Sequence, residues 1–250
     1  MMDATAPNAM QCPVFVVAER HDALDKPWLA ERRAQFVHVS EGVLSVRTDS
    51  GLWVVPPHHA VWLLPGALHR ASSRHPVMTR TLFANPEVVA APARNCVVAV
   101  DPLVRELLIA AAEFGDGYAG DGPQARLVDV IVDRLPLLAA APLSLPYPRD
   151  RRILRIAESL IAQPAQPGVL DELAADAGVT ARTAARLFVK ETGLTFGQWR
   201  QQLRLLIALE RLGAGASVTQ VALEVGYNDV SSFIAVFKES LGETPARYFR

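Results

Sequence analysis

The sequence predicts a two-domain α+β protein, with an N-terminal β-barrel followed by helices and an all-α C-terminal domain. Three observations support this prediction. Short apolar runs separated by turn residues fill the first third of the chain. Pro142, Pro146 and Pro148 then fall within ten residues of one another. After these prolines, apolar residues recur with helical spacing almost to the end of the sequence.

Composition limits the classes of protein to which the chain can belong. Its 250 residues are 50% hydrophobic and 20% charged, which is enough apolar content for two cores. The formal net charge is −1, and from Arg149 onward 13 Lys and Arg stand against 11 Asp and Glu. Cys12 and Cys96 do not have a metal-binding spacing, and no apolar run is long enough to span a membrane. We therefore expect a cytoplasmic protein with no membrane partner.

The N-terminal part is predicted to be a leader over 1–12 and a β-barrel over 13–95. Turn signals, such as the Pro65-Gly66 pair, separate its short apolar runs. Many short strands at near-regular spacing favour a small barrel or sandwich. The predicted strands are Val14–Val17, Phe36–Val39, Val43–Val46, Leu52–Val55, Val61–Leu64 and Thr79–Phe83.

A helical segment over 96–141 is predicted to follow the barrel, with helices at 103–114 and 124–140. The prolines that come next indicate a semi-rigid linker over 142–150.

The second of these helices carries an apolar stripe at helical spacing, formed by Leu127, Ile131, Leu135 and Leu138. Pro136 is expected to kink or end the helix. The stripe fits two interpretations equally well, because packing against the barrel and a dimer interface both require an apolar helix face.

Residues 151–250 contain one pattern twice, at 170–192 and at 218–241. Both copies include an alanine followed four residues later by a glycine, as in Ala174–Gly178 and Ala222–Gly226. The small alanine lets two helices approach closely, and the glycine supplies the positive φ of a tight turn. Each copy therefore predicts a helix–turn–helix unit, whose second helix is the part that can enter a major groove of DNA.

The second helix of the first unit carries three cations at intervals of four residues, Arg182, Arg186 and Lys190. This spacing places them on one side of a helix, opposite Leu187 and Phe188. Such a stripe can contact phosphates and guanine edges, or it can be a solvated face.

The candidate DNA contacts of the second unit are more mixed in character. Short polar residues at a helix start can bind phosphate through backbone N–H groups or can serve as helix caps, and both interpretations stay open. The complete candidate set is Arg182, Thr183, Arg186, Lys190, Asn228, Asp229, Ser231, Ser232 and Lys238.

The pattern of 151–250 resembles the DNA-binding domain of the AraC/XylS family of transcription regulators over about a hundred residues. The resemblance implies seven helices, in which one long helix, here 195–213, joins the two helix–turn–helix units. The units would enter successive major grooves on one face of the duplex. The residues that carry the resemblance include Leu173-Ala174, Gly178-Val179-Thr180, Arg186-Leu187-Phe188, Trp199-Arg200, Val225-Gly226-Tyr227, Leu241-Gly242 and Thr244-Pro245.

The segment from Gly42 to His69 resembles the small cupin barrel that precedes this DNA-binding domain in short members of the family. The resemblance implies that the barrel senses a small-molecule effector and that helices within 103–140 form a homodimer. Aromatic and histidine side chains are the candidate ligand contacts, although the core interpretation is the preferred one for each. These candidates are Phe36, His38, Trp53, Trp62 and His69.

The resemblance to cupins also raises a rival hypothesis, a metal-dependent enzyme with a regulatory helical domain. His38 and His69 would be its metal ligands. The early strand has Trp28-Leu29-Ala30 where related chains carry a His-x-His pair, and a cupin metal site needs several histidines. We therefore expect no metal, no cofactor and no catalytic residues.

The sequence thus predicts a sequence-specific transcription factor that binds double-stranded DNA and responds to an effector in its barrel. Contact with RNA polymerase is a further expectation. A scaffold whose helical domain binds protein is a third, weaker alternative. The identity of the effector, the target genes and the choice between activation and repression stay open.

Overall fold

The computed structural model describes residues 12–90 and 92–249, so that the predicted leader lies outside the described residues except for Cys12. The chain forms two compact units. Among the described residues, one unit contains 12–48 together with 53–90 and 92–143, and the other contains 49–52 and 144–249. The boundary after residue 143 falls within the segment predicted to be the linker.

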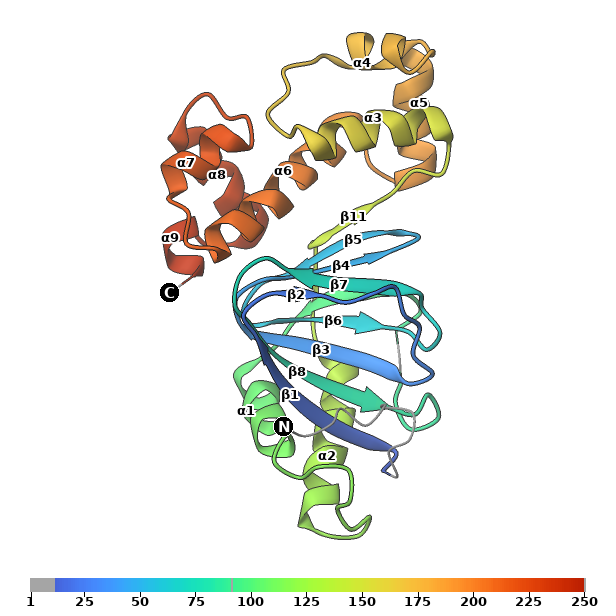
Figure 1. The fold of residues 1–250 in the computed structure, drawn as a ribbon, viewed down its shortest axis with the longest axis vertical. Coiled ribbons are helices and arrows are strands. Elements are labelled where there is room, and N and C mark those ends of the chain that lie inside the picture. The colour runs from blue at the N-terminus through green and yellow to red at the C-terminus, as the bar shows by residue number, and fades with distance from the viewer. Residues whose placement is uncertain (1–11, 91, 250) are drawn as a thin grey trace. The chain divides into compact units, whose positions relative to one another are not determined.

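The β-rich part consists of two sheets (Figure 1). The six-stranded sheet has the order β1-β8-β3-β6-β9-β10, and the five-stranded sheet has the order β11-β5-β4-β7-β2. These strands confirm the predicted β-rich N-terminal fold, and they include β2, β7, β9, β10 and β11, which the sequence analysis did not identify. Their bounds are β1 (Val14–His21), β2 (Leu24–Asp25), β3 (Ala34–Glu41), β4 (Leu44–Thr48), β5 (Gly51–Val55), β6 (His59–Leu63), β7 (His69–Ser73), β8 (Val77–Ala84), β9 (Cys96–Ala99), β10 (Ala140–Ala141) and β11 (Ser144–Pro146).

The central strands of the six-stranded sheet are buried on both faces. In β3, the six residues from Ala34 to Val39 are all buried. Side chains alternate between the faces of a strand, so Phe36 lies on the face opposite to Gln35 and Val37. On the Phe36 side, the ring packs edge-on against Trp62 at a centroid distance of 5.4 Å. Both belong to a hydrophobic core that includes residues of the following helices.

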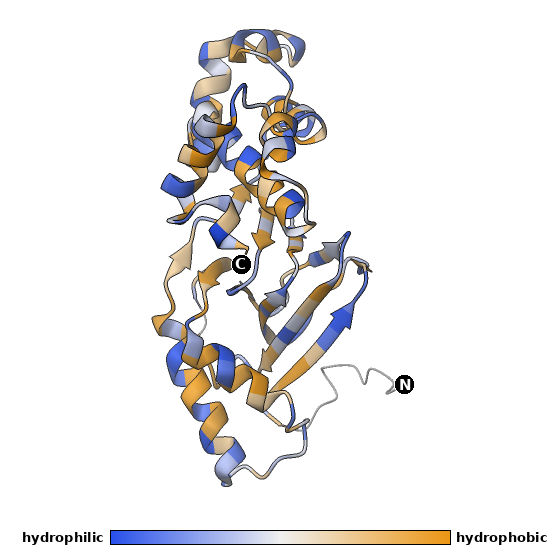
Figure 2. Cartoon of the chain, turned by 90° about the vertical axis from the view of Figure 1, so that its left-hand side faces the viewer, coloured by the Kyte–Doolittle hydropathy of each residue, from blue (hydrophilic) through white to orange (hydrophobic). Residues whose placement is uncertain are grey.

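Two helices, α1 (Pro102–Ala111) and α2 (Pro123–Arg134), contribute to this core. In Figure 2, apolar and polar residues alternate along the helices at the bottom of the view, as expected for helices with one buried face. The second helix is shorter than predicted, because a 3-10 turn over Leu135–Leu137 replaces its last part at Pro136. None of the helices in the described part of the chain is both long and apolar enough to cross a membrane.

The apolar stripe of α2 packs into the core of its own unit. Ile131 and Leu135 are buried there, and Leu127 and Leu138 pack against the same cluster. Of the two interpretations of this stripe, the structure supports core packing. An interface between two copies would have to use other side chains of the segment.

The second unit is helical, and its described residues form the seven helices that the resemblance implies. The long helix α6 is capped by Thr195, whose side chain accepts from the Gln198 N–H while the Gln198 side chain accepts from the Thr195 N–H. Trp199 and Phe188 are fully buried at the centre of the first half of this unit. The helices are α3 (Arg151–Ala162), α4 (Leu170–Asp176), α5 (Ala181–Thr192), α6 (Phe196–Gly213), α7 (Val218–Glu224), α8 (Val230–Leu241) and α9 (Pro245–Tyr248).

Part of the predicted linker is fixed to the helical unit. The indole N–H of Trp199 donates to the carbonyl of Pro146 at 2.8 Å. One carboxylate oxygen of Glu191, near the end of α5, accepts from the backbone N–H groups of Arg149 and Asp150 at 2.7 and 2.9 Å. These hydrogen bonds hold the end of the proline-rich segment against α5 and α6, so it is not a free spacer.

Two neighbouring residues of α2 should respond very differently to truncation. Ile131 is fully buried, whereas Val130 is 44% exposed. Ile131→Ala should lower the free energy of unfolding of the first unit by about 2–5 kcal/mol, because it leaves a cavity in the core. At a protein concentration low enough to keep the chain monomeric, Val130→Ala should change it by less than about 0.5 kcal/mol. Urea denaturation followed by circular dichroism measures both, and equal effects would contradict the packing of α2.

Candidate DNA interface and ligand cavity

Each helix–turn–helix unit turns at a glycine with left-handed backbone geometry. The φ of Gly178, between α4 and α5, is +75°, and the φ of Gly226, between α7 and α8, is +86°. At Gly226, a Cβ atom would also lie 2.9 Å from the Cα of Ala165 and 2.7 Å from a guanidinium nitrogen of Arg204. Only glycine satisfies both requirements, so the turn predicted from the repeated spacing has a physical basis.

Helix α5 presents a cationic face. Its buried side contains Ala184, Leu187 and Phe188, while the predicted cations Arg182, Arg186 and Lys190 are exposed. Within the described ranges, these three cations form no ion pair with an acidic side chain. Exposed, uncompensated cations on one helix face are what phosphate contact requires.

Thr183 takes part in the cap of α5. The Thr180 hydroxyl accepts from the Thr183 N–H at 3.3 Å and lies 3.1 Å from the Thr183 hydroxyl. Thr180 is therefore the N-cap that the sequence predicts, and Thr183 is half-buried beside it. Its hydroxyl already has one partner before any DNA contact.

Helix α8 has a nearly neutral face, and two of its candidate residues serve as a cap. Asp229 is the N-cap, and its carboxylate accepts from the Ser232 N–H and from the Ser232 hydroxyl, each at 2.7 Å. Hydrogen bonds from Ser232 lower the pKa of the Asp229 carboxyl, and the one from the Ser232 hydroxyl has a larger effect than the one from its backbone N–H. The remaining candidates, Asn228, Ser231 and Lys238, are exposed.

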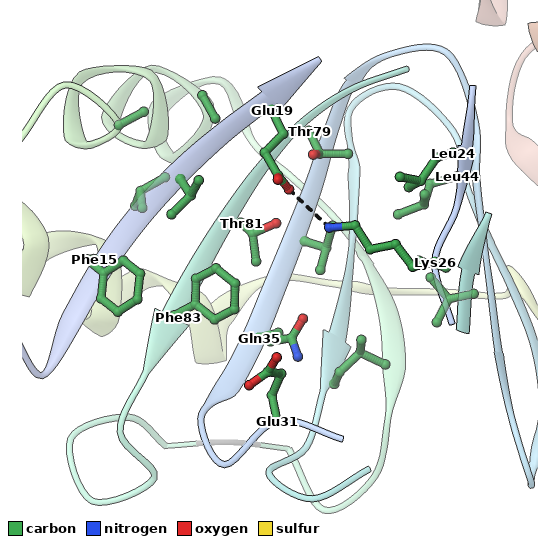
Figure 3. A pocket seen from close by; sticks show the side chains of 18 of the residues that line it. Phe15, Glu19, Leu24, Lys26, Glu31, Gln35, Leu44, Thr79, Thr81 and Phe83 are labelled. Carbon is green, nitrogen blue, oxygen red and sulfur yellow. Dashed lines mark hydrogen bonds and ion pairs between the residues drawn. The ribbon is translucent and has the colours of Figure 1, made fainter. Parts of the chain in front are cut away.

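A cavity of about 600 Å³ lies between the two sheets of the first unit (Figure 3). This volume is within the usual range of small-molecule sites. Most of its wall is apolar, and at one end Phe15 and Phe83 stack with ring centroids 5.2 Å apart. Polar side chains also line it, among them Gln35, Thr79 and Thr81.

Of the five predicted ligand contacts, His69 alone lines this cavity. Phe36 and Trp62 belong to the core beneath α1 and α2, and Trp53 is buried outside the cavity wall. His38 follows Phe36 by two residues in β3, so its side chain lies on the same face of the sheet and points away from the cavity. These four residues are buried outside this cavity wall, which agrees with the core interpretation that the sequence favours for each of them. The strands are buried on both faces, and burial alone does not tell which face encloses a cavity.

The two histidines of the metal-site hypothesis lie apart in the first unit. His38 is fully buried, its Nδ1 lies 3.1 Å from the His59 carbonyl oxygen, and burial lowers its pKa to about 4. His69 lies on the cavity side, so the two cannot ligate one ion. Among the described residues, no group of three or more His, Cys, Asp or Glu side chains is placed to hold a metal ion.

The His69 ring presents an acceptor to the cavity. Its Nδ1 lies 2.9 Å from the Ala67 carbonyl oxygen, which requires a proton on Nδ1. Burial lowers the pKa of His69, so the ring is neutral near pH 7 and its Nε2 has a free lone pair. Sequence reasoning missed Gln35, Thr79 and Thr81, although polar residues at alternate positions of apolar strands were a visible signal.

The chain is similar in sequence to known helix-turn-helix regulators. A family model described as a helix-turn-helix domain matches residues 173–250. The HTH-type transcriptional regulator NimR from Escherichia coli is 35% identical over 234 residues, which cover 94% of this chain and 86% of NimR. The regulator RipA from Corynebacterium diphtheriae is 37% identical over 136 residues, covering 54% of this chain and 39% of RipA. Among solved structures, ToxT from Vibrio cholerae matches 96% of both chains at 10% identity and a TM-score of 0.41.

The fold and the extended similarity to NimR define a DNA-binding transcriptional regulator of the helix-turn-helix type. The chain belongs to the AraC/XylS family of these regulators, which are not enzymes.

The cations of α5 can be tested one at a time. Arg182→Ala and Arg186→Ala should each weaken binding to DNA from upstream of the protein's own gene. For every phosphate that is no longer neutralised, the slope of log affinity against log salt should fall by about one. Arg74→Ala, an exposed arginine in the turn between β7 and β8, is the control. Fluorescence anisotropy across a salt series measures both quantities, and unchanged slopes in both α5 variants would exclude this face.

Asp229 separates the roles of cap and DNA contact. Asp229→Ala should lower the melting temperature, whereas Asp229→Asn should keep most of it because asparagine also caps helices well. The pKa of the folded-state carboxyl is depressed, so the stability that Asp229 contributes is present near neutral pH and is lost on acidification below its usual pKa. Calorimetry between neutral and acid pH measures this. A stable Asp229→Ala variant with weakened DNA binding would instead make Asp229 a DNA contact.

Proposed function

We propose that this regulator is sequence-specific and that a small molecule in the cavity between its two sheets changes how it binds DNA. The observation that carries the proposal is the cavity itself, whose interior combines apolar walls with buried polar side chains. Sites for small molecules have this composition, because apolar walls supply affinity and a few polar groups fix orientation.

The cavity wall supports a route from ligand to helices. Ala112, Gly115 and Asp116, which directly follow α1, line the cavity together with residues of β1. The Tyr118 hydroxyl donates to the Val14 carbonyl on β1 at 2.6 Å, so this loop is fastened to the sheet. A ligand that contacts both would favour one placement of the loop over others, which is the differential interaction that a conformational shift requires.

Helices α1 and α2 respond to such a shift together. The Asp101 carboxylate caps α1 through the Val104 N–H at 2.9 Å, and its other oxygen accepts from Arg134 of α2 at 2.9 Å. These contacts link the start of one helix to the end of the other. Displacement of α1 at its cavity end would therefore be passed to α2.

The proposal includes a homodimer formed through 103–140. Its support is a set of large apolar side chains that α1, α2 and the 3-10 turn leave exposed, which self-association would bury. These are Leu103, Ile109, Val130 and Leu137, at 51, 37, 44 and 69% exposure.

The proposed DNA contacts lie on α5 and α8. Arg182, Arg186 and Lys190 would supply most of the charge, while Asn228, Ser231 and Lys238 would contact DNA from α8. Thr183, Asp229 and Ser232 would contribute mainly by capping. The 18 residues of α6 span about 27 Å, which suits two units that enter grooves roughly 34 Å apart once the width of the units is added.

Filling the cavity with a larger side chain should reduce the effect of the ligand on DNA binding. Ala71 lines the cavity on β7, and Ala71→Leu would add side-chain volume inside it. The variant should still bind the upstream DNA but should respond at least about tenfold less to whatever compound changes wild-type reporter expression in a library screen. The physical reason is that a steric clash with the added side chain weakens ligand binding by about 1.4 kcal/mol or more.

The control for this experiment is Ala99→Leu on β9, an exposed position outside the cavity wall. An unchanged dose response in Ala71→Leu would place the effector elsewhere. Loss of DNA binding in both variants would point to misfolding, which a melting curve detects.

A further inference from the structure

Three polar side chains line the cavity, and their polar atoms are accessible from it and not sealed within the protein. Gln35, Thr79 and Thr81 are 7, 4 and 6% exposed, and all three line the cavity (Figure 3). Within the described residues, their side chains make no hydrogen bond to another group of the chain. Buried polar groups in folded proteins are almost always satisfied. A molecule that enters this cavity must therefore bring hydrogen-bonding groups to this wall.

The acceptors on this wall suit a ligand that donates hydrogen bonds. The Gln35 side chain contributes a carbonyl oxygen beside its NH2 donor, and the two threonine hydroxyls can accept or donate. With Nδ1 protonated, the Nε2 of His69 can only accept. Glu31 lines the same cavity and lies within electrostatic range of His69. An ammonium or amidinium group is a compact set of donors that matches these acceptors.

The charge of the cavity wall favours the same kind of ligand. Three carboxylates line it, those of Glu19, Glu31 and Asp116, against the single ammonium group of Lys26. The Lys26 ammonium is paired with Glu19 at 3.3 Å, and His21 Nε2 lies 3.8 Å from the same carboxylate oxygen. Negative charge on a partly enclosed apolar cleft raises the local concentration of cations and repels anions.

The Glu19–Lys26 pair lies where such a cation would compete. Glu19 is on β1, the edge strand of one sheet, and Lys26 directly follows β2, the edge strand of the other. Their side chains are 35 and 39% exposed, so the ion pair bridges the two sheets at the more open part of the cavity (Figure 3). A ligand cation offers Glu19 an alternative partner.

We propose that the effector of this cavity is a small organic cation: a protonated amine or amidine on an apolar, ring-bearing body. The charged group donates to Gln35, the threonine hydroxyls and the carboxylates. The body packs against Phe15, Phe83 and the aliphatic wall. This inference rests on the proposed function and adds the chemical class of the ligand.

Matched compounds test the class on the purified full-length chain. 4-Phenylbutylamine, 4-phenylbutanol and 4-phenylbutyrate share one body and differ in the charge of the head group. Isothermal titration calorimetry should find the amine binding about tenfold or more tighter than the alcohol, as expected for hydrogen bonds to a charged group. The carboxylate should bind most weakly. The same order should hold for cyclohexyl and naphthyl bodies.

Variants of the wall locate the binding. Glu31→Gln should reduce the affinity for the amine and leave that for the alcohol unchanged, whereas Thr81→Val should weaken both. Glu87→Gln, an exposed carboxylate outside the cavity, should change neither. Melting curves confirm that each variant is folded.

The possible failures are distinguishable. If the carboxylate binds tightest, and Lys26→Met abolishes its binding, the ligand class is overturned while the cavity remains the effector site. If binding is insensitive to Thr81→Val and to Gln35→Leu, the proposed effector site is overturned as well. If no amine binds more tightly than its alcohol on any of the three bodies, the cationic class is overturned.

Discussion

The six-stranded sheet is buried on both of its faces, and the structure of the first unit depends on this constraint. Strands β3 and β8 must pack against helices on one side and enclose a cavity on the other. Phe36 and Leu82 meet this demand by joining the core with α1 and α2, while Val37, Thr81 and Phe83 line the cavity. Because the parity of a strand is strict, the core side fixes which residues a ligand can touch. The helix-facing core thus determines the chemistry of the cavity.

The helical unit shows how one local motif can carry two different surfaces. Both turns use a glycine at positive φ, and both second helices begin with a side-chain cap. Their outer faces differ, because α5 exposes Arg182, Arg186 and Lys190, whereas α8 exposes Lys238 among short polar residues. Charge-driven affinity for the DNA backbone would then arise chiefly from the first helix–turn–helix unit. The second would contribute through shape and neutral contacts.

The two helix–turn–helix units were predictable from local signals, because caps, turn glycines and helical periodicity are short-range features. The seven helices and the long joining helix were expected from the resemblance to the AraC/XylS domain. The predicted joining helix over 195–213 differs from α6 by one residue at its start. The cavity was not predictable in the same way. In β3 every position from Ala34 to Val39 is buried, so the sequence does not alternate between buried and exposed residues. Nothing local therefore indicates that Gln35, and not Phe36, faces the cavity. Short strands such as β2 and β7 lack apolar runs, and their pairing depends on distant partners.

The proposed regulation requires coupling between the cavity and the DNA-binding helices, and thermodynamic linkage makes that coupling measurable from either end. The most direct test is the affinity of a cavity-binding amine for the full-length protein, measured with and without saturating upstream DNA. The account predicts that DNA changes this affinity by the same factor by which the amine changes the affinity for DNA. Identical amine affinities in the two states would show that the cavity and the DNA-binding helices are uncoupled, and would contradict it.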